Sequence, residues 1–166
     1  MTTLKMPRVD RKILKDREKI IKDISGFTNP ENILTEREEL KPYETDGLTA
    51  YKQTPMIVVL PKTTQEVSKI LSYCNKNKIK VVPRGAGTGL AGSALPLADC
   101  VLLGLGKFNK ILEVDYKNRC VVAQPGVTNL SITNAVEGQD FYYAPDPSSQ
   151  IACSIGGNVA ENSGGV

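Results

Sequence analysis

The feature that most constrains the fold is a glycine-rich stretch, Pro83 to Ser93, which lies between two apolar runs with the composition of β-strands. Four of its residues within eight positions are glycine, at positions 85, 87, 89 and 92. Glycine has no Cβ, so such a loop can adopt positive φ angles and direct several backbone N–H groups at one anion. The stretch predicts either a phosphate-binding loop or a tight bend without a ligand, and by itself it does not separate the two.

The same stretch satisfies the dinucleotide-binding pattern G-x-G-x-x-G at Gly87, Gly89 and Gly92. In a Rossmann domain that pattern opens a crossover helix, and a crossover needs at least about 10 to 12 residues. Here Pro96 and a further strand-like run follow too soon, so the context excludes that fold. A P-loop is excluded as well, because Phe108 follows Gly-Leu-Gly-Lys where Ser or Thr would bind magnesium.

Upstream of this loop the pattern predicts a βαβ unit. Met56 to Leu60 is a short apolar run between prolines, and Ile79 to Val82 is a second apolar run. Between them, Thr63 and Glu66 form a capping box that begins a helix, which continues at helical spacing to about Lys76. Such a unit is normally right-handed.

Residues 1–54 are expected to form an N-terminal helix and a connecting arm. The segment from Asp10 to Ile24 carries Ile and Leu at helical spacing, and Gly26 follows as a stop. Residues 27–54 contain prolines, a glycine and many charges without a period, so we expect at most short helical turns there. Residues 55–166 then form the main domain.

Three strand-like segments follow the glycine-rich stretch, over Cys100 to Leu103, Ile111 to Val114 and Cys120 to Ala123. A short helix is predicted over 127–135 and a short strand over 141–143. We expect the strands near 100, 111 and 120 to share one mixed sheet with the βαβ unit. The result is an α+β fold with its ligand loops on one side.

A second loop-like region runs from Ala144 to Gly165. Two prolines stiffen its beginning, and small hydroxyl residues and two pairs of adjacent glycines follow. This composition suits a ligand that approaches the backbone closely, since amides and the side chains of Asn158 or Asn162 can bond to phosphate, ribose or ring edges. One such loop is compatible with a simple bend, whereas two argue for a binding site.

Composition excludes several other classes of protein. The 21 basic and 18 acidic residues are interspersed, Trp is absent and 5% of residues are aromatic, so a nucleic-acid-binding surface is not expected. The four cysteines show no C-x-x-C and there is no histidine, which argues against structural zinc. No apolar run approaches the roughly 20 residues of a membrane span. The polar N-terminus predicts no secretory signal, and hence a cytoplasmic location with reduced thiols.

The segments PRGAGTGLAGSALP and YYAPDPSSQIACSIGGNVAENSGGV resemble the FAD-binding domain of the vanillyl-alcohol oxidase and p-cresol methylhydroxylase (PCMH) flavoproteins, and within that family the glycolate oxidase and D-lactate dehydrogenase group. The resemblance extends from about Tyr43 to the last residue. It implies a PCMH-type α+β fold, noncovalent FAD as cofactor, and a domain over 55–166 that is truncated at its C-terminus.

In this family the first loop holds the FAD diphosphate, and the second lines the diphosphate, the ribose and the flavin edge. The resemblance therefore implies that the cofactor-binding residues are Arg84, Gly85, Ala86, Gly87, Thr88, Gly89, Gly92, Ser93, Pro145, Asp146, Ser149, Ser154, Ile155, Gly156, Gly157, Asn158, Ala160 and Asn162. For Arg84 a carboxylate partner is the alternative to phosphate.

The family oxidises 2-hydroxy acids with a histidine base, and some members use a histidine-bound metal, but this chain contains no histidine. We therefore expect an FAD-binding portion without a metal site, inactive until a cap and a C-terminal region are supplied. Asp146, Glu161 and Tyr142 are conceivable bases, but isolated carboxylates near loops are mostly solvated or capping groups. No catalytic residue is assigned. The lack of histidine also excludes a histidyl-flavin bond, and Cys153 is better explained as a small buried residue than as a flavin attachment point.

Two functions remain open on sequence alone. The first is the FAD half-site of a glycolate or D-lactate dehydrogenase or oxidase, which implies a 2-hydroxy-acid substrate and possible contact with other subunits of a glycolate oxidase complex at the inner face of the membrane. The second is a non-catalytic flavin-binding remnant or a truncated reading frame. The coding sequence downstream would separate them.

Overall fold

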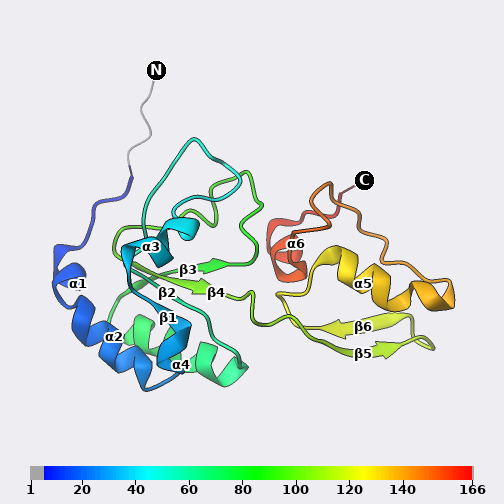
Figure 1. Cartoon of the computed structure of the whole chain (residues 1–166), viewed down its shortest axis with the longest axis horizontal. Coiled ribbons are helices and arrows are strands. Elements are labelled where there is room, and N and C mark those ends of the chain that lie inside the picture. The colour runs from blue at the N-terminus through cyan, green and yellow to red at the C-terminus, as the bar shows by residue number, and fades with distance from the viewer. Residues whose placement is uncertain (1–5, 166) are drawn as a thin grey trace.

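The computed structural model describes residues 6–165, which form two lobes joined by the segment 105–110 (Figure 1). The first lobe contains a four-stranded sheet with helices packed on both faces. The second lobe contains a two-stranded hairpin and two α-helices. Residues 1–5 and 166, the outer ends of the two predicted domains, lie outside the described residues.

The sheet of the first lobe has the strand order β1-β2-β4-β3. β2 (Ile57–Val59) and β3 (Lys80–Arg84) both run parallel to β4 (Cys100–Gly104), which lies between them, whereas β1 (Ile33–Leu34) pairs antiparallel with β2. The predicted βαβ unit is therefore confirmed, with β4 inserted between its strands. Parallel strands end at the same edge of a sheet, and ligands of open α/β sheets bind beyond that edge. The glycine-rich loop leaves β3 there.

The central helix of this unit, α4 (Thr64–Lys76), begins at the predicted capping box. The Glu66 amide donates to Thr63 Oγ1 at 3.2 Å, and the Thr63 amide donates to Glu66 Oε2 at 3.0 Å. At the N-terminus the structure has two short helices, α1 (Arg11–Lys15) and α2 (Arg17–Ser25), in place of the single predicted one.

The core of the first lobe lies on both faces of the sheet because alternate strand residues point to opposite sides. On one face the strands pack against α2 and α4, through the buried residues Ile20, Ile24, Ile57, Val59, Ile70, Cys74, Val101 and Leu103. On the other face Val58 and Leu102 pack against Leu40.

The connecting arm contains more structure than its sequence predicts. Besides β1 it holds two 3₁₀ turns and a short helix, which are η1 (Pro30–Asn32), η2 (Lys41–Tyr43) and α3 (Arg37–Leu40). The strand was not predicted, because two residues are too few to show an alternating pattern.

The second lobe is built on the hairpin of β5 (Ile111–Asp115) and β6 (Cys120–Ala123). Its helices are α5 (Asn129–Val136), which continues into the 3₁₀ turn η3 (Glu137–Gln139), and α6 (Ile155–Glu161). The predicted helix over 127–135 corresponds to α5.

The prediction of one shared sheet is wrong, since β5 and β6 form a sheet of their own. The reason is topological. β4 already has β2 on one side and β3 on the other, so no edge beside it is free for the strands that follow. The chain instead leaves the sheet after Gly104 and turns through the linker, where the Phe108 carbonyl accepts a bond of 2.7 Å from the Gly126 amide.

Two further expectations for the second lobe were wrong. Residues 141–143 form no strand: the Phe141 ring packs on Tyr116 with centroids 5.7 Å apart, and the Tyr143 amide donates to Thr133 Oγ1 at 3.2 Å, so no strand edge lies alongside. Conversely, residues 155–161 form α6 in a region that reads as a loop, because two adjacent glycines conceal the helical pattern.

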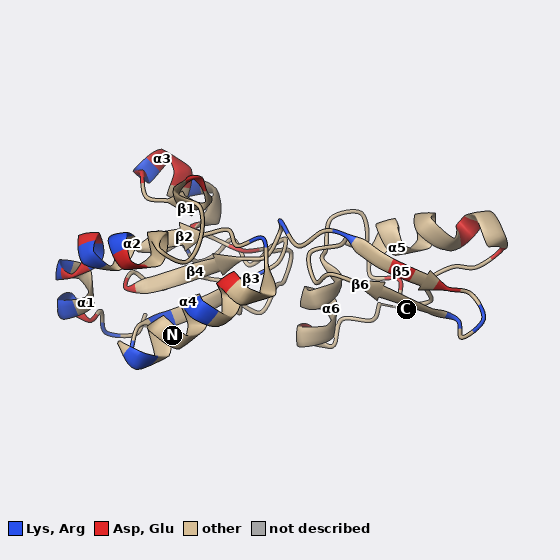
Figure 2. Cartoon of the chain, turned by 90° about the horizontal axis from the view of Figure 1, so that it is seen from below, with Lys and Arg blue, Asp and Glu red and all other residues tan. Residues whose placement is uncertain are grey.

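Acidic and basic residues are interspersed over α1 to α4, and α5 and α6 carry few charges (Figure 2). Within residues 6–165, none of the helices has the length and apolar character needed to cross a bilayer.

Candidate functional site

Both glycine-rich loops line one open cavity of about 860 Å³ between the two lobes. Gly87 of the first loop and Gly157 of the second face the same space, which confirms that the two loops lie on one side. The predicted site residues that line this cavity are Arg84, Gly85, Ala86, Gly87, Thr88, Gly89, Ser93, Ser149, Ser154, Gly156, Gly157, Asn158 and Ala160.

Five predicted residues do not line it, namely Gly92, Pro145, Asp146, Ile155 and Asn162. Their backbones shape the loops instead. The Asp146 amide donates to the Gly164 carbonyl at 2.8 Å, and Asn162 ends α6 with a φ of 55°. Gly92 adopts a φ of 78°.

Other cavity residues were not predicted. Some lie inside the second loop, where the composition of the loop could have included them: Pro147, Ser148, Cys153, Ser163 and Gly165. Glu161 also lines the cavity, and it was considered only as a conceivable base. Pro83, Leu90, Ala91 and Ala94 flank or lie within the first loop. Leu105 and Pro125 have no sequence signal, because only the turn of the linker brings them to the cavity.

The first loop has the features of an anion cradle. Within the described residues, the amides of 86–93 donate to no backbone carbonyl and to no side chain, so they are available to a ligand. Gly87 has a φ of 75°, and a Cβ on it would lie 2.2 Å from Arg84 Nη2. Only glycine fits this position without strain.

The second loop closes the cavity from the other lobe. The loops meet at Gly85, where a Cβ would lie 2.0 Å from Ser154 Oγ, and again where the Ser93 hydroxyl donates to the Glu161 carboxylate. Asn158, which is buried, donates from Nδ2 to Asn129 Oδ1 at 3.2 Å. α5 therefore fixes the side chain that α6 presents to the cavity.

Arg84 is directed at the connecting arm. Its Nη1 donates to the Thr45 carbonyl at 2.6 Å, and its guanidinium carbon lies 5.7 Å from the centre of the Tyr43 ring. Burial lowers the pKa of Arg84, and the nearby Asp46 carboxylate acts in the opposite direction. No carboxylate forms an ion pair with this guanidinium among residues 6–165.

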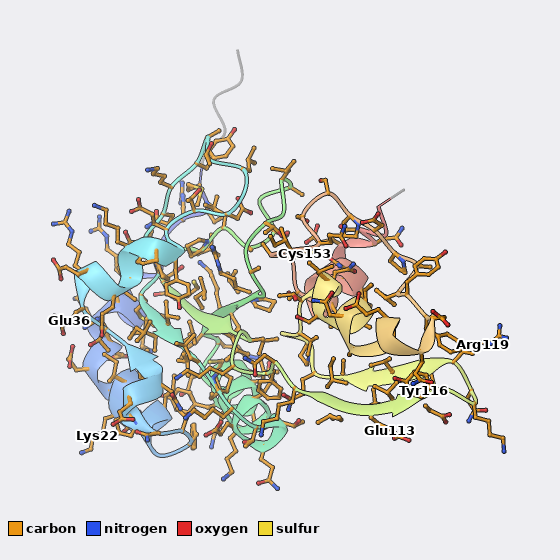
Figure 3. The ribbon with its side chains drawn as sticks, turned by 45° about the vertical axis from the view of Figure 1, so that its right-hand side comes forward. Lys22, Glu36, Glu113, Tyr116, Arg119 and Cys153 are labelled. Atoms are coloured by element: carbon orange, nitrogen blue, oxygen red, sulfur yellow. The ribbon has the colours of Figure 1, made fainter. Side chains whose placement is uncertain are left out.

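The described residues bring together no group of three or more potential metal ligands. Of the conceivable bases, only Glu161 lines the cavity, where it is bonded to Ser93. Tyr142 is 75% exposed and lines a different pocket in the second lobe. In Figure 3, Cys153 lies on the side of the second lobe that faces the first, whereas Tyr116 and Arg119 lie at the far end of the hairpin.

This arrangement fits a cofactor with a diphosphate. It offers unpaired amides, the small hydroxyl residues Thr88, Ser93, Ser149 and Ser154, and glycines that let the backbone approach a ligand. Its volume falls within the usual range of small-molecule sites, roughly 300–1,000 Å³. One carboxylate, that of Glu161, lines the cavity, and it is already bonded to a hydroxyl.

Comparison with known proteins agrees with this chemistry. The family described as FAD binding domain matches residues 55–166. The glycolate oxidase subunit GlcD of Escherichia coli (strain K12) is 52% identical over 151 residues, which cover 91% of this chain and 30% of that protein. The D-lactate dehydrogenase of Anaerostipes hadrus is 38% identical over 138 residues, which cover 82% of this chain and 29% of that protein.

The fold has its counterpart among solved structures. p-Cresol methylhydroxylase with substrate bound superposes with a TM-score of 0.73 at 24% identity, over 93% of this chain and 30% of that one. The chain thus spans about 30% of the length of the proteins that it matches. It belongs to the FAD-binding-domain family, with the α+β fold of the PCMH-type flavoproteins, and its cofactor is FAD.

Proposed function

We propose that this chain is the FAD-binding portion of a flavin-dependent 2-hydroxy-acid dehydrogenase or oxidase that acts on a substrate such as glycolate or D-lactate. The observation that carries the proposal is the single cavity lined by both glycine-rich loops, in a chain 52% identical to a glycolate oxidase subunit. When bound, FAD supplies the electron acceptor for the oxidation of the acid.

The residues of this chain bind and orient the cofactor. The free amides of the first loop would hold the diphosphate, and the Thr88 hydroxyl would add a donor. From the second lobe, Ser154, Gly157 and Asn158 line the same cavity and would hold the remainder of the cofactor. The binding is noncovalent, because the chain has no histidine for a histidyl-flavin bond and Cys153 is a buried small residue.

We assign removal of the substrate hydroxyl proton to a group from further polypeptide, since the chain has no histidine and, among residues 6–165, the one carboxylate that lines the cavity already accepts a bond from Ser93. An apolar pocket of about 380 Å³ in the second lobe supports additional polypeptide packing there. It adjoins a hairpin with exposed apolar residues, among them Leu112 at 60% and Val122 at 47%. A two-stranded sheet is marginally stable alone, so further polypeptide packed on these residues would stabilise it.

The test is an anaerobic mixture of the FAD-loaded chain with glycolate or D-lactate, followed by the flavin absorbance band. We expect no bleaching by the chain alone, and bleaching after addition of the histidine-bearing remainder of a full-length relative. Bleaching by the chain alone, at a rate on the order of 1 per second or faster, would contradict the assignment of the base to further polypeptide.

The second candidate is a non-catalytic flavin-binding remnant. The specific observation in its favour is the absence of histidine together with the openness of the cavity to solvent. Retained FAD with no bleaching in either mixture would support it. Under the first candidate, the protein acts in the cytoplasm, and subunits of a glycolate oxidase complex bring it to the inner face of the membrane.

A further inference from the structure

Residues 43–48 of the connecting arm, here named the clasp, lie directly behind the first glycine-rich loop. A Cβ on Gly47 would lie 2.6 Å from the Thr88 carbonyl oxygen and 2.7 Å from that of Gly89. The arm and the loop are therefore in backbone contact, although about 40 residues separate them in the chain. No residue of the clasp lines the cavity itself.

Arg84 connects the clasp to the loop through a buried charge. The side chain donates to the Thr45 carbonyl at 2.6 Å and lies over the Tyr43 ring, as a guanidinium does in a cation–π contact. The backbone of Gly87 rests against the same guanidinium, because a Cβ there would lie 2.2 Å from Nη2. The conformation of the loop therefore depends on where Arg84 is held.

Asp46, the neighbour of Thr45 in the chain, is the buried carboxylate of the clasp. The residue is 5% exposed, its Oδ1 accepts a bond of 3.0 Å from the Leu48 amide, and its Oδ2 has no partner among the described residues. Burying a carboxylate in this way is costly unless an opposite charge is near. Asp46 acts on Arg84 in the direction that keeps the guanidinium protonated.

Bonds to the residues that follow the clasp help to hold this geometry. The Thr45 hydroxyl donates to the Tyr51 carbonyl at 3.0 Å, and the Gln53 amide donates to the Glu44 carbonyl at 2.8 Å. Both bonds join the clasp to residues 51 and 53. The arm therefore presents a preformed surface to the loop.

We propose that the clasp is part of the FAD site, and that Arg84 and Asp46 are positioning residues that shape the diphosphate loop from behind. Arg84 then acts on FAD through Gly87 and not as a phosphate ligand. This inference rests on the assignment of FAD to the cavity, and it extends the site beyond the residues that line it.

The direction in which Asp46→Asn changes the affinity for FAD tells whether Arg84 binds phosphate directly or positions the loop. If Arg84 contacted phosphate directly, Asp46→Asn would remove a nearby negative charge and strengthen the binding of the anionic diphosphate. In the clasp account the same change leaves Arg84 uncompensated and loosens the loop. We expect the Kd for FAD to rise about 10-fold in Asp46→Asn, in the range usual for losing an interaction of a charged group.

Two further variants test the geometry. Arg84→Lys keeps the charge but cannot bond a carbonyl and cover a ring in the same way, so we expect a similar rise. Gly47→Ala changes no charge and lies outside the cavity, yet it should weaken FAD binding by pushing on Thr88 and Gly89. The matched controls are Glu38→Gln, an exposed carboxylate, and Gly106→Ala, where a Cβ meets nothing within 4 Å.

The experiment measures each variant by calorimetric titration with FAD and by ¹⁵N amide spectra of the free chain. The clasp account predicts that the amide signals of Gly85, Gly87 and Gly89 move or broaden in Asp46→Asn and Gly47→Ala before FAD is added, while signals of α5 stay unchanged. Unchanged loop signals, or an unchanged or tighter Kd in Asp46→Asn, would overturn it. Failure of the unsubstituted chain to bind FAD would contradict the cofactor assignment alone, because the free-chain spectra still test the clasp.

Discussion

The two lobes differ in how completely they are packed. In the first, strand residues such as Val58 and Val101 are fully buried between helices on both faces of the sheet. In the second, β6 and α6 leave Val122 and Val159 exposed, the latter by 75%. The cavity lies between the two lobes. The well-packed first lobe should hold its loop rigidly, whereas the order of the second lobe should depend more on the ligand or polypeptide that contacts it.

The largest effect is expected from Gly87→Val in the first lobe. The residue has a φ of 75°, and its Cβ would meet the guanidinium of Arg84, so valine must distort the loop that carries the free amides. Backbone strain of this kind costs about 1–3 kcal/mol before any clash is added. FAD co-eluting with the chain in gel filtration, measured by flavin absorbance, should disappear. Stoichiometric retention of FAD would refute the cradle assignment.

Because the lobes differ in packing, truncating an apolar side chain should reduce the free energy of unfolding more in the first lobe than in the second. Ile70 of α4 is fully buried, so Ile70→Ala should reduce the free energy of unfolding by about 2–5 kcal/mol. Val159→Ala in the second lobe should change it by no more than about 0.5 kcal/mol. Urea denaturation measures both. Comparable losses would show that the second lobe is as tightly packed as the first.

A smaller effect is expected at the start of α4. Thr63→Ala removes the hydroxyl that accepts from the Glu66 amide and should cost about 1 kcal/mol in the free energy of unfolding. Thr64→Ala is the matched control, because that exposed threonine makes no such bond and should change stability by less than about 0.5 kcal/mol. Equal effects of the two changes would argue against the capping box.

The smallest effect is expected in the dependence of the free energy of unfolding on pH. Burial would raise the pKa of Asp99, but bonds from Lys80 Nζ and the Asp10 amide outweigh it and hold the pKa below its ordinary value. A lowered folded pKa stabilises the chain above the unfolded value of about 3.9, and the stabilisation is lost as pH falls through the folded pKa. The loss of stability between about pH 5 and pH 3 should therefore be smaller in Asp99→Asn. Urea denaturation of both chains at pH 5 and pH 3 measures the difference, and an equal loss in the two would contradict this role of Asp99.

The same contrast explains what could be predicted from the sequence. In the first lobe, Thr63 and Glu66 mark the start of α4, and apolar runs mark β2 and β3, because these signals are local and strong. In the second lobe, we wrongly expected β5 and β6 to pair with the main sheet. They cannot pair with β4, because β2 and β3 already flank it on both sides, and no local pattern shows this. α6 was missed because Gly156 and Gly157 lie inside it.

At the site, the composition of the sequence identified both glycine-rich loops. It did not identify the side-chain contacts that hold these loops in place. Arg84 was predicted to face phosphate or a carboxylate; it lines the cavity, and the contacts with the Thr45 carbonyl and the Tyr43 ring were not predicted. Leu105 and Pro125 reach the cavity only through the linker. Such contacts join segments far apart in the chain, and no local pattern specifies them.

The central claim is that both lobes bind one FAD, and the most direct test changes the second lobe alone. In Gly157→Val, a side chain is placed in the cavity near Ser154, whose Oγ would lie 3.2 Å from the new Cβ. Calorimetric titration should give one FAD per unsubstituted chain and a loss of binding in this variant. Gly138→Ala, where a Cβ meets nothing within 4 Å, serves as the control. Unchanged affinity in Gly157→Val would contradict the account, because FAD would then be held by the first loop without the second.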